Sequence, residues 1–418
     1  MTSDFSQTLK AATACIRCGA CMEVCPLYQR TGREAAVARG KLSLLQAFLG
    51  GTLSPSGRLL EILEYCLLCG ACVERCTAKI PIPDLVKAGR AEIYDRLGHN
   101  WSPNLALAHL SLHADRLLPA LNASSSLLPR LISLLGRKSG LLYRLWPSLA
   151  GLVERLPQPA SQPLTHLAPD FLPGAGKQKI AFFIGCGLQA LFPQAGLAFL
   201  KICQRLGIEV IIPKQQNCCG LLATSVGDLK TARLLGRNVI RQFAGLKVDY
   251  LVTACASCSY QLKRLDRLFP DSLEREQAGS LALKVKEASE YLADLEKLDH
   301  LHFPARAPST SVVFHDPCHG RRGQQIVRQP RQVLATRPRL ELREPHSPVA
   351  CCGQGGLFGI CHPDMGKAIG LDALASYQQT GADLLATSCS GCLVQLMSLT
   401  TPALPVRHFL EILAEALE

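Results

Sequence analysis

The chain has 418 residues, a formal net charge of +12 and 48% hydrophobic residues, which fits a multidomain globular protein rather than a disordered or fibrous one. Its 20 cysteines do not suit a small secreted disulfide scaffold, because the N-terminal stretch is polar and lacks the apolar core of a signal peptide. We therefore expect a cytoplasmic protein with metal-bound thiols. We expect no transmembrane segment, since no apolar run reaches about 18 residues, and no nucleic-acid partner, since no such motif accompanies the charge.

Residues 1–100 contain two cysteine motifs of identical spacing, C-x2-C-x2-C-x3-C, the first followed by Pro26 and the second by Thr77. This spacing is typical of bacterial [4Fe–4S] proteins, in which the fourth cysteine of each motif binds the other cluster. It predicts two cubane clusters, and a zinc site is the weaker alternative. The predicted ligands are Cys15, Cys18, Cys21 and Cys76 for the first cluster, and Cys66, Cys69, Cys72 and Cys25 for the second.

The segment between the two motifs has a helical pattern over 32–51, which favours an α-helical ferredoxin domain over 1–100 rather than a compact β-ferredoxin. Residues 101–178 contain no cysteine and are basic and rich in Leu, Pro and Arg. They predict a linker of short amphipathic helices broken by prolines. Two roles stay open for this linker: docking on a partner or membrane surface, or packing on its own chain.

Residues 179–418 contain an internal repeat, because two sets of five cysteines share one template. Equivalent cysteines are offset by 132, 133 and 134 residues, which indicates a duplication and predicts two domains over 179–305 and 306–418. The first set is Cys186, Cys218, Cys219, Cys255 and Cys258, and the second is Cys318, Cys351, Cys352, Cys389 and Cys392.

Short apolar runs that read as buried strands precede these cysteines, and helical stretches separate the strands. KIAFFIG precedes Cys186, DYLVTA precedes Cys255, SVVFHDP precedes Cys318 and ADLLATS precedes Cys389. Alternating strands and helices predict a mainly parallel sheet in each repeat, and such sheets place their ligands at the carboxyl ends of the strands. Each repeat therefore gathers five thiols at one sheet edge.

Together these features resemble the iron–sulfur subunit family of bacterial glycolate oxidase: a twin-cluster ferredoxin followed by two CCG domains, named after the CCG triplets at 218–220 and 351–353. Related families are the iron–sulfur subunits of D-lactate and anaerobic glycerol-3-phosphate dehydrogenases and the catalytic subunit of heterodisulfide reductase. Three stretches favour the glycolate oxidase branch: RGKLSLL, CCGQGGLFGICHPDM and LLATSCSGCLVQLM. The implied fold class is α+β multidomain: an α-helical ferredoxin domain, a helical linker and two tandem α/β CCG domains with mainly parallel sheets.

The resemblance implies an electron-transfer subunit of a flavin-dependent glycolate or D-lactate dehydrogenase, with no catalytic residue of its own and substrate oxidation on a separate FAD-binding subunit. Electrons would pass toward quinone or another acceptor, with the chain peripheral on the inner face of the membrane as one option. The resemblance also implies one or two further [4Fe–4S] clusters, of a noncubane type, held by the five cysteines of each repeat. A disulfide-reducing role and a module of another redox complex are the alternatives.

Four further residues are candidates for structural or supporting roles. Cys203 lies at an apolar helical position and is expected in the core. Cys361 is expected to be structural. His315 and His319 flank Cys318, and either a hydrogen bond to cluster sulfur or a structural role is open for each.

Overall fold

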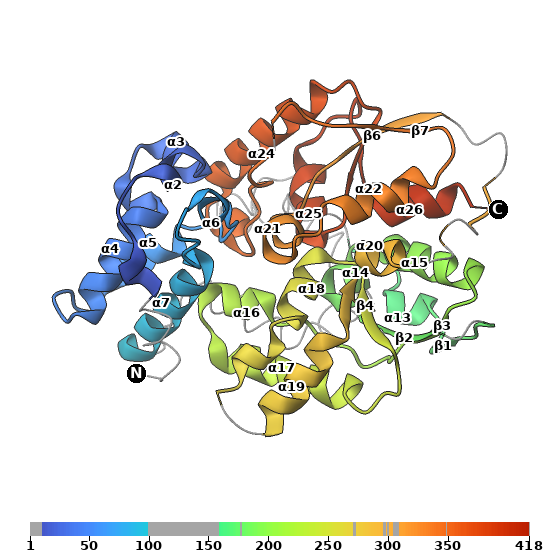
Figure 1. Ribbon diagram of the computed structural model, residues 1–418, viewed down its shortest axis with the longest axis horizontal. Coiled ribbons are helices and arrows are strands. Elements are labelled where there is room, and N and C mark those ends of the chain that lie inside the picture. The colour runs from blue at the N-terminus through green and yellow to red at the C-terminus, as the bar shows by residue number, and fades with distance from the viewer. Residues whose placement is uncertain are drawn as a thin grey trace, which may run out of the picture.

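The computed structural model describes residues 11–98, 159–175, 178–270, 273–295, 298, 301–303, 309–347 and 349–417. A helical N-terminal domain lies beside two α/β domains, as Figure 1 shows, and this confirms the predicted fold class. Most of the predicted 101–178 linker lies outside the described residues. Over the described residues, no helix is both long enough and apolar enough to cross a membrane.

The N-terminal domain is built from short helices around the two motif loops. Helix α4 buries Leu42, Leu45 and Phe48, which recur at helical spacing on one face. In α5 the Ser56 side chain accepts a hydrogen bond from the backbone N–H of Leu59, an N-cap that fixes the start of the helix. The elements are η1 (Ala11–Ala14), α2 (Ala20–Glu23), α3 (Pro26–Thr31), η2 (Glu34–Ala36), α4 (Ala38–Leu49), α5 (Gly57–Glu64), α6 (Ala71–Arg75) and α7 (Ile82–Leu97).

The first repeat forms a five-stranded sheet with the order β1-β3-β2-β4-β5, in which only the β1–β3 pairing is antiparallel. Its strands are β1 (Phe171–Leu172), β2 (Lys179–Phe182), β3 (Glu209–Ile211), β4 (Tyr250–Thr253) and β5 (Val285–Glu287). Its helices are α13 (Leu164–Leu167), α14 (Gly185–Ala190), α15 (Pro193–Arg205), α16 (Leu221–Val226), α17 (Leu229–Phe243), α18 (Ala256–Leu262), η5 (Leu265–Leu268), α19 (Leu273–Leu283) and α20 (Ala288–Ala293).

The second repeat forms a four-stranded, fully parallel sheet with the order β7-β6-β8-β9, which is the order of the first sheet without β1. Its strands are β6 (Thr310–Phe314), β7 (Leu340–Arg343), β8 (Leu384–Thr387) and β9 (Val406–His408). Its helices are α21 (Cys318–Gln324), α22 (Arg328–Ala335), α23 (Phe358–Cys361), α24 (Pro363–Gln378), α25 (Ser390–Leu399) and α26 (Phe409–Glu415). The strands predicted before Cys186, Cys255, Cys318 and Cys389 are all present.

The two repeats pack against each other with approximate two-fold symmetry. Helix α15 of the first repeat packs on α26 of the second, and α22 of the second packs on α20 of the first (Figure 1). These are equivalent pairs, since α15 corresponds to α22 and α20 to α26 in the duplicated topology. Such an arrangement resembles an isologous dimer fused into one chain, and it brings the equivalent cysteine loops of the two repeats together.

The ferredoxin domain contacts both repeats. Buried Arg90 of α7 donates hydrogen bonds to the carbonyl oxygen of Leu63 within its own domain and to that of Ser225 in the first repeat. Gly355 of the second repeat packs against the backbone of Leu67, where an added Cβ would lie 3.0 Å from the Leu67 carbonyl oxygen. Gly355, which follows the second vicinal cysteine pair, therefore allows close approach of the ferredoxin domain.

Candidate metal centres

The two ferredoxin motifs adopt matching loop conformations. Arg17 and Leu68 have φ values of 58° and 55°, and Gly19 and Gly70 have φ values of 83° and 73°. These left-handed residues curl each loop so that its cysteines face inward. Helices α2 and α6, which follow the two loops, pack against each other. The two motifs are therefore close enough to exchange their fourth cysteines.

The first predicted set of ligands surrounds one cavity. Cys15, Cys18, Cys21 and Cys76 all line a space of about 40 Å³, together with Cys72 of the other motif. A cavity walled by thiols from both motifs fits an iron–sulfur cluster with an exchanged fourth ligand.

The second predicted set is equally compact. Burial raises the pKa of Cys72 well above its usual value, and the charges of Cys69, Cys66 and Cys25 add to this effect. Burial likewise raises the pKa of Cys25, and Cys66 contributes to that shift. Cys25 thus faces the cysteines of the second motif. Thiols that repel each other when ionised suit a cluster, whose iron neutralises their charge.

Three cations not singled out by sequence reasoning surround these cysteines. Arg39 donates to the carbonyl oxygen of Arg17 at 3.4 Å, buried Lys41 donates to that of Ala35 at 2.6 Å, and Arg90 donates to that of Cys66 at 3.1 Å. The RGKLSLL stretch contains the first two. The positive charges of these three residues offset the negative charge of thiolates. Without such compensation, burial of the thiolates would be unfavourable.

In the first repeat the five cysteines meet at the carboxyl ends of β2 and β4. This is the point where the strand order reverses direction, the usual ligand site of an open parallel sheet. The Sγ atoms of Cys186 and Cys218 are 3.8 Å apart. Hydrogen bonds from Cys218 and Cys258 lower the pKa of Cys219 to about 6, so this thiol ionises readily.

The second repeat gathers its five cysteines in the same way. The Sγ atoms of Cys352 and Cys392 are 3.4 Å apart. Hydrogen bonds from Cys318 and Cys352 hold the pKa of Cys351 well below its usual value. Each vicinal pair therefore contains one thiol that is stabilised as a thiolate, the form that binds iron.

The cysteine groups of the two repeats touch each other. The thiol of Cys389 hydrogen-bonds to that of Cys255, which is its equivalent in the first repeat. Ser257 adds a polar contact across the same boundary, since its hydroxyl lies 3.1 Å from Cys389 Sγ and 2.9 Å from His319 Nδ1. Ser257 was not predicted as a site residue, although its place inside a C-x2-C unit is a usable signal.

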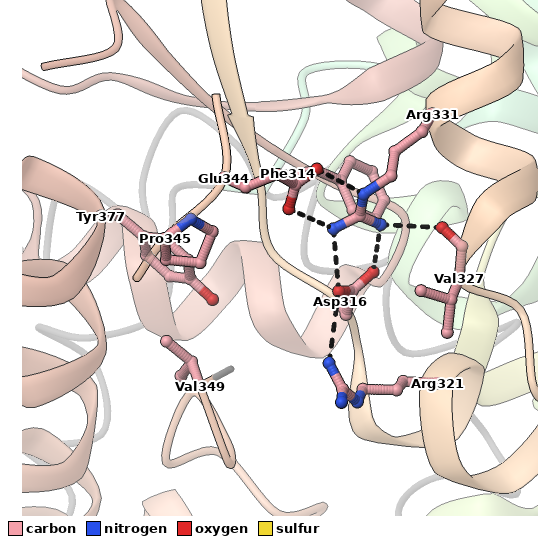
Figure 2. A pocket seen from close by; sticks show the side chains of 9 residues that line it. All are labelled: Phe314, Asp316, Arg321, Val327, Arg331, Glu344, Pro345, Val349 and Tyr377. Carbon is pink, nitrogen blue, oxygen red and sulfur yellow. Dashed lines mark hydrogen bonds and ion pairs between the residues drawn. The ribbon is translucent and has the colours of Figure 1, made fainter. Parts of the chain in front are cut away.

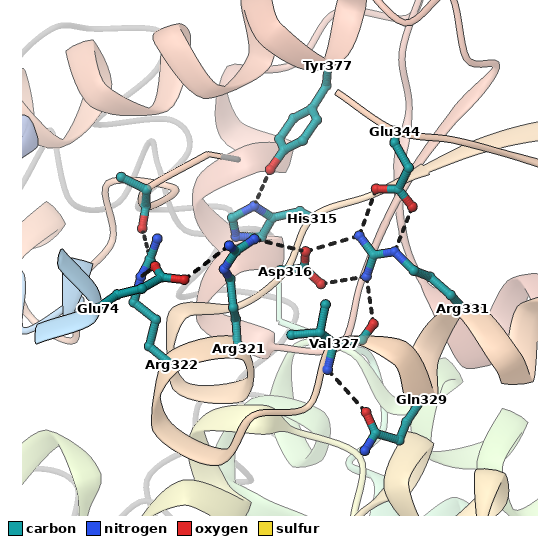
Figure 3. A network of polar contacts seen from close by, with 11 residues as sticks. Glu74, His315, Asp316, Arg321, Arg322, Val327, Gln329, Arg331, Glu344 and Tyr377 are labelled. Carbon is teal, nitrogen blue, oxygen red and sulfur yellow. Dashed lines mark hydrogen bonds and ion pairs between the residues drawn. The ribbon is translucent and has the colours of Figure 1, made fainter. Parts of the chain in front are cut away.

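The second repeat also meets the ferredoxin domain at its cysteines. Cys351 and Leu67 belong to one group of buried hydrophobic side chains, and Cys25 and Cys69 pack against that group. Burial alone would lower the pKa of Arg322, but Cys69, Glu74 and Cys318 outweigh burial and raise it. Arg322 Nε donates to a carboxylate oxygen of Glu74 in α6 at 2.7 Å, and Figure 3 shows the two side chains together. This cation therefore bridges the two cysteine groups.

A pocket of about 400 Å³ opens at this junction. Cys69 and Cys318 both line it, together with His319, Tyr260 and Arg264 among others. His319 stacks on Tyr260 with ring centroids 4.5 Å apart, and the Arg264 guanidinium lies 3.9 Å from the Tyr260 ring centroid. Cysteines of two neighbouring groups are therefore reached from one opening.

Two residues expected to be structural sit away from the ligand sets. Cys203 is fully buried in α15, within the core, as predicted. Cys361 is half-buried at the end of α23, and burial raises its pKa to about 11. An inert thiol is what a structural role requires.

Asp316 anchors the loop after β6. It accepts two hydrogen bonds from Arg331, at 2.8 and 3.0 Å, and Arg331 also pairs with Glu344 beyond β7. These side chains line a pocket of about 210 Å³, which Figure 2 shows with Tyr377 on its opposite wall. The ion pairs hold the β6–α21 loop, and with it Cys318, in place.

Comparison with known proteins agrees with this geometry. A family model described as a 4Fe-4S dicluster domain matches residues 11–80, and one described as a cysteine-rich domain, CCG, matches 180–263 and 312–397. The chain is 30% identical to the probable glycolate oxidase iron-sulfur subunit of Bacillus subtilis over 391 residues, covering 91% of this chain and 87% of that protein. The chain belongs to the glycolate oxidase iron-sulfur subunit family.

Two further relatives show the breadth of this family's neighbours. The glycolate oxidase iron-sulfur subunit of Escherichia coli is 24% identical over 419 residues, covering 97% of this chain and 94% of that protein. Lactate utilization protein A of Halalkalibacterium halodurans is 28% identical over 219 residues, covering 52% of this chain and 88% of that protein. The two cysteine-rich matches confirm the duplication and identify the two repeats as CCG domains.

The glycines that follow the vicinal pairs give a matched pair of variants. Gly220 and Gly353 have φ values of 87° and 92°, so alanine is strained at both. We expect Gly220→Ala to lower the free energy of unfolding by about 1–2 kcal/mol. Gly353→Ala should cost more, because its Cβ would lie 2.2 Å from the Gly366 carbonyl oxygen, whereas at Gly220 the nearest atom is at 3.6 Å. Denaturant midpoints measure both, and equal costs would contradict the steric argument.

Proposed function

We propose that this chain is the electron-transfer subunit of a flavin-dependent 2-hydroxy-acid dehydrogenase that oxidises glycolate or D-lactate. In this proposal a separate FAD-binding subunit oxidises the substrate, and electrons pass through this chain toward quinone or another acceptor. The observation that carries it is the unbroken series of cysteine groups from the ferredoxin domain through the second CCG domain to the first. A series of adjacent cysteine groups suits electron transfer between several centres, whereas catalysis would need only one reaction centre.

Four cysteine sets would hold the metal centres. They are Cys15, Cys18, Cys21 and Cys76; Cys66, Cys69, Cys72 and Cys25; Cys186, Cys218, Cys219, Cys255 and Cys258; and Cys318, Cys351, Cys352, Cys389 and Cys392. All eighteen are thiols outside any disulfide. Bound iron–sulfur clusters supply reversible one-electron chemistry. The domain limits at 100 and 305 and a cytoplasmic location, peripheral to the membrane, belong to the same proposal. The predicted limit at 178 is too late, because α13 and β1 already pack in the first CCG domain.

The protein's own residues position these groups and set their electrostatics. Buried carbonyl and cation contacts, such as those of Lys41 and Arg90, fix the ferredoxin loops. Arg322 places a positive charge between Cys69 and Cys318. The hydrogen bond between Cys255 and Cys389 joins the two CCG domains. The last two contacts lie between cysteine sets, where they hold the distance between the sets constant.

A second candidate function is disulfide reduction at the CCG domains. The observation that favours it is that both repeats keep all five cysteines. The pocket between Cys69 and Cys318 would then be the entry for a disulfide substrate.

One experiment separates the two functions. The tagged full chain is isolated anaerobically from its native host. We expect FAD to co-purify, and glycolate or D-lactate to bleach the visible iron–sulfur absorbance of the complex. The second candidate would be favoured if neither acid reduced the iron–sulfur centres and if small disulfides oxidised the reduced protein. Omitting the tagged chain provides the control for co-purified FAD.

A further inference from the structure

The two CCG domains differ at one pair of side chains beside their cysteines. The cysteine offsets of 132–134 residues align Phe183 and Phe243 of the first repeat with His315 and Tyr377 of the second. The structure confirms this equivalence, because the ring centroids of each pair are 5.8 Å apart. The apolar pair Phe183 and Phe243 of the first domain is thus replaced in the second domain by the polar pair His315 and Tyr377.

His315 is fully buried, and only one of its two ring nitrogens has a hydrogen-bond partner within the described part of the chain. Its Nδ1 lies 2.6 Å from the Tyr377 hydroxyl oxygen (Figure 3). Its Nε2 is buried and, among the described residues, has no hydrogen-bond partner. A buried polar nitrogen normally has a partner, so one is expected on the side that Nε2 faces.

Two cysteines of the second set lie close enough to provide that partner. The sulfur atoms of Cys352 and Cys392 and a ring nitrogen of His315 all lie within 4.8 Å of one another. The Tyr377 hydroxyl occupies Nδ1, which leaves Nε2 for the sulfurs. The first domain offers only the hydrocarbon ring of Phe183 at this place.

We propose that His315 donates an Nε2–H hydrogen bond to cysteine sulfur of the second CCG centre, with the Tyr377 hydroxyl donating to Nδ1 and fixing this tautomer. The inference rests on the proposed function, since it requires an iron–sulfur centre at these cysteines. His315 is a positioning residue here rather than a ligand. The first domain has the same five thiols with phenylalanine in this place, so a nitrogen ligand is not needed to complete the set.

The consequence is an asymmetry between the two centres. Hydrogen bonds to sulfur raise the reduction potential of an iron–sulfur centre. The second centre is therefore easier to reduce than the first. It also lies between the ferredoxin cysteines and those of the first domain. Electrons that arrive from either neighbouring group would therefore reside preferentially on the centre of the second CCG domain.

The test is a redox titration of anaerobically purified full-length protein, followed by EPR, with iron content measured on the same samples. The Cys352→Ser variant identifies the signal of the second centre. We expect His315→Phe to lower the midpoint potential of that centre and to leave the first unchanged. His315→Gln should restore much of the potential, because its amide can donate to sulfur. Tyr377→Phe should give a smaller decrease, and Phe183→Leu, the matched control, should leave the second centre unchanged.

Three outcomes would overturn the inference. An unchanged potential in both His315→Phe and Tyr377→Phe, with the second centre present, would refute the hydrogen bond while leaving the proposed function intact. Loss of iron from the second centre alone in His315→Phe would make the histidine a ligand. A wild-type protein without iron at this site would refute the inference and the CCG part of the proposed function together.

Discussion

Cys352→Ser and Cys219→Ser are each expected to remove about four irons per chain, from their own CCG domain only. Both thiols are buried and lie among four partner cysteines. Cys352 Sγ is 3.4 Å from Cys392 Sγ, and Cys219 hydrogen-bonds to Cys218 and Cys258. Serine is a poor substitute, since iron–sulfur clusters are held by thiolates.

Iron and acid-labile sulfide are measured on anaerobically purified variants, and EPR reports the ferredoxin clusters. Those clusters should persist in both variants, because their predicted ligands are separate. Cys203→Ala is the control: it alters a buried cysteine in the core of α15, away from the sets, and should retain all iron. Unchanged iron in both serine variants would mean that the CCG domains are not cluster sites.

Arg90→Ala is expected to lower the free energy of unfolding by about 3–5 kcal/mol. Arg90 is 4% exposed, and its guanidinium donates to the carbonyl oxygens of Leu63, Glu64, Cys66 and Ser225. Alanine would leave these acceptors buried without a donor and open a cavity. Because Ser225 belongs to the first CCG domain, the variant should also loosen the docking of the ferredoxin domain.

The anaerobic denaturant midpoint measures this effect, and the rate of limited proteolysis between the domains reports the docking. Arg58→Ala is the matched control, since Arg58 is exposed and, among the residues that the structure describes, pairs only with Glu61, at 2.8 Å in the same helix. It should change stability by less than about 0.5 kcal/mol. A similar small effect for Arg90→Ala would show that the carbonyl oxygens find other donors.

The grouping of the cysteines was predictable where their spacing encodes it, while their role as ligands stays a prediction. The C-x2-C-x2-C-x3-C motifs and the CCG template depend on local loop geometry. The groups of cysteines could therefore be predicted from their spacing in the sequence. Strands such as β2 and β6 were also predictable, because they are buried on both sides and appear as continuous apolar runs.

Other strands could not be predicted because they are very short. Strands β5 and β9 have three residues each, VKE and VRH, too few to show a period. Strand β1, Phe171–Leu172, lies in the region assigned to the linker and pairs with β3 at the sheet edge. Only tertiary pairing decides that such a dipeptide is a strand.

Contacts between domains were beyond sequence reasoning for a different reason. Arg90 and Ser225 are 135 residues apart, and Cys255 and Cys389 meet only because the repeats pack as a pair. The sequence does contain the difference between Phe183 and His315 at the repeat offset. Its meaning depends on tertiary structure, which places His315 Nε2, without a partner among the described residues, near the sulfurs of Cys352 and Cys392.

We propose that four iron–sulfur centres form one continuous series in this chain. The most direct measurement is the metal and sulfide content of the anaerobically purified full chain, combined with EPR of the fully reduced protein. We expect about 16 irons per chain, four for each centre, and spectra broadened by magnetic interaction between neighbouring centres. Zinc in place of iron, or about eight irons with narrow signals from two isolated cubanes, would contradict it.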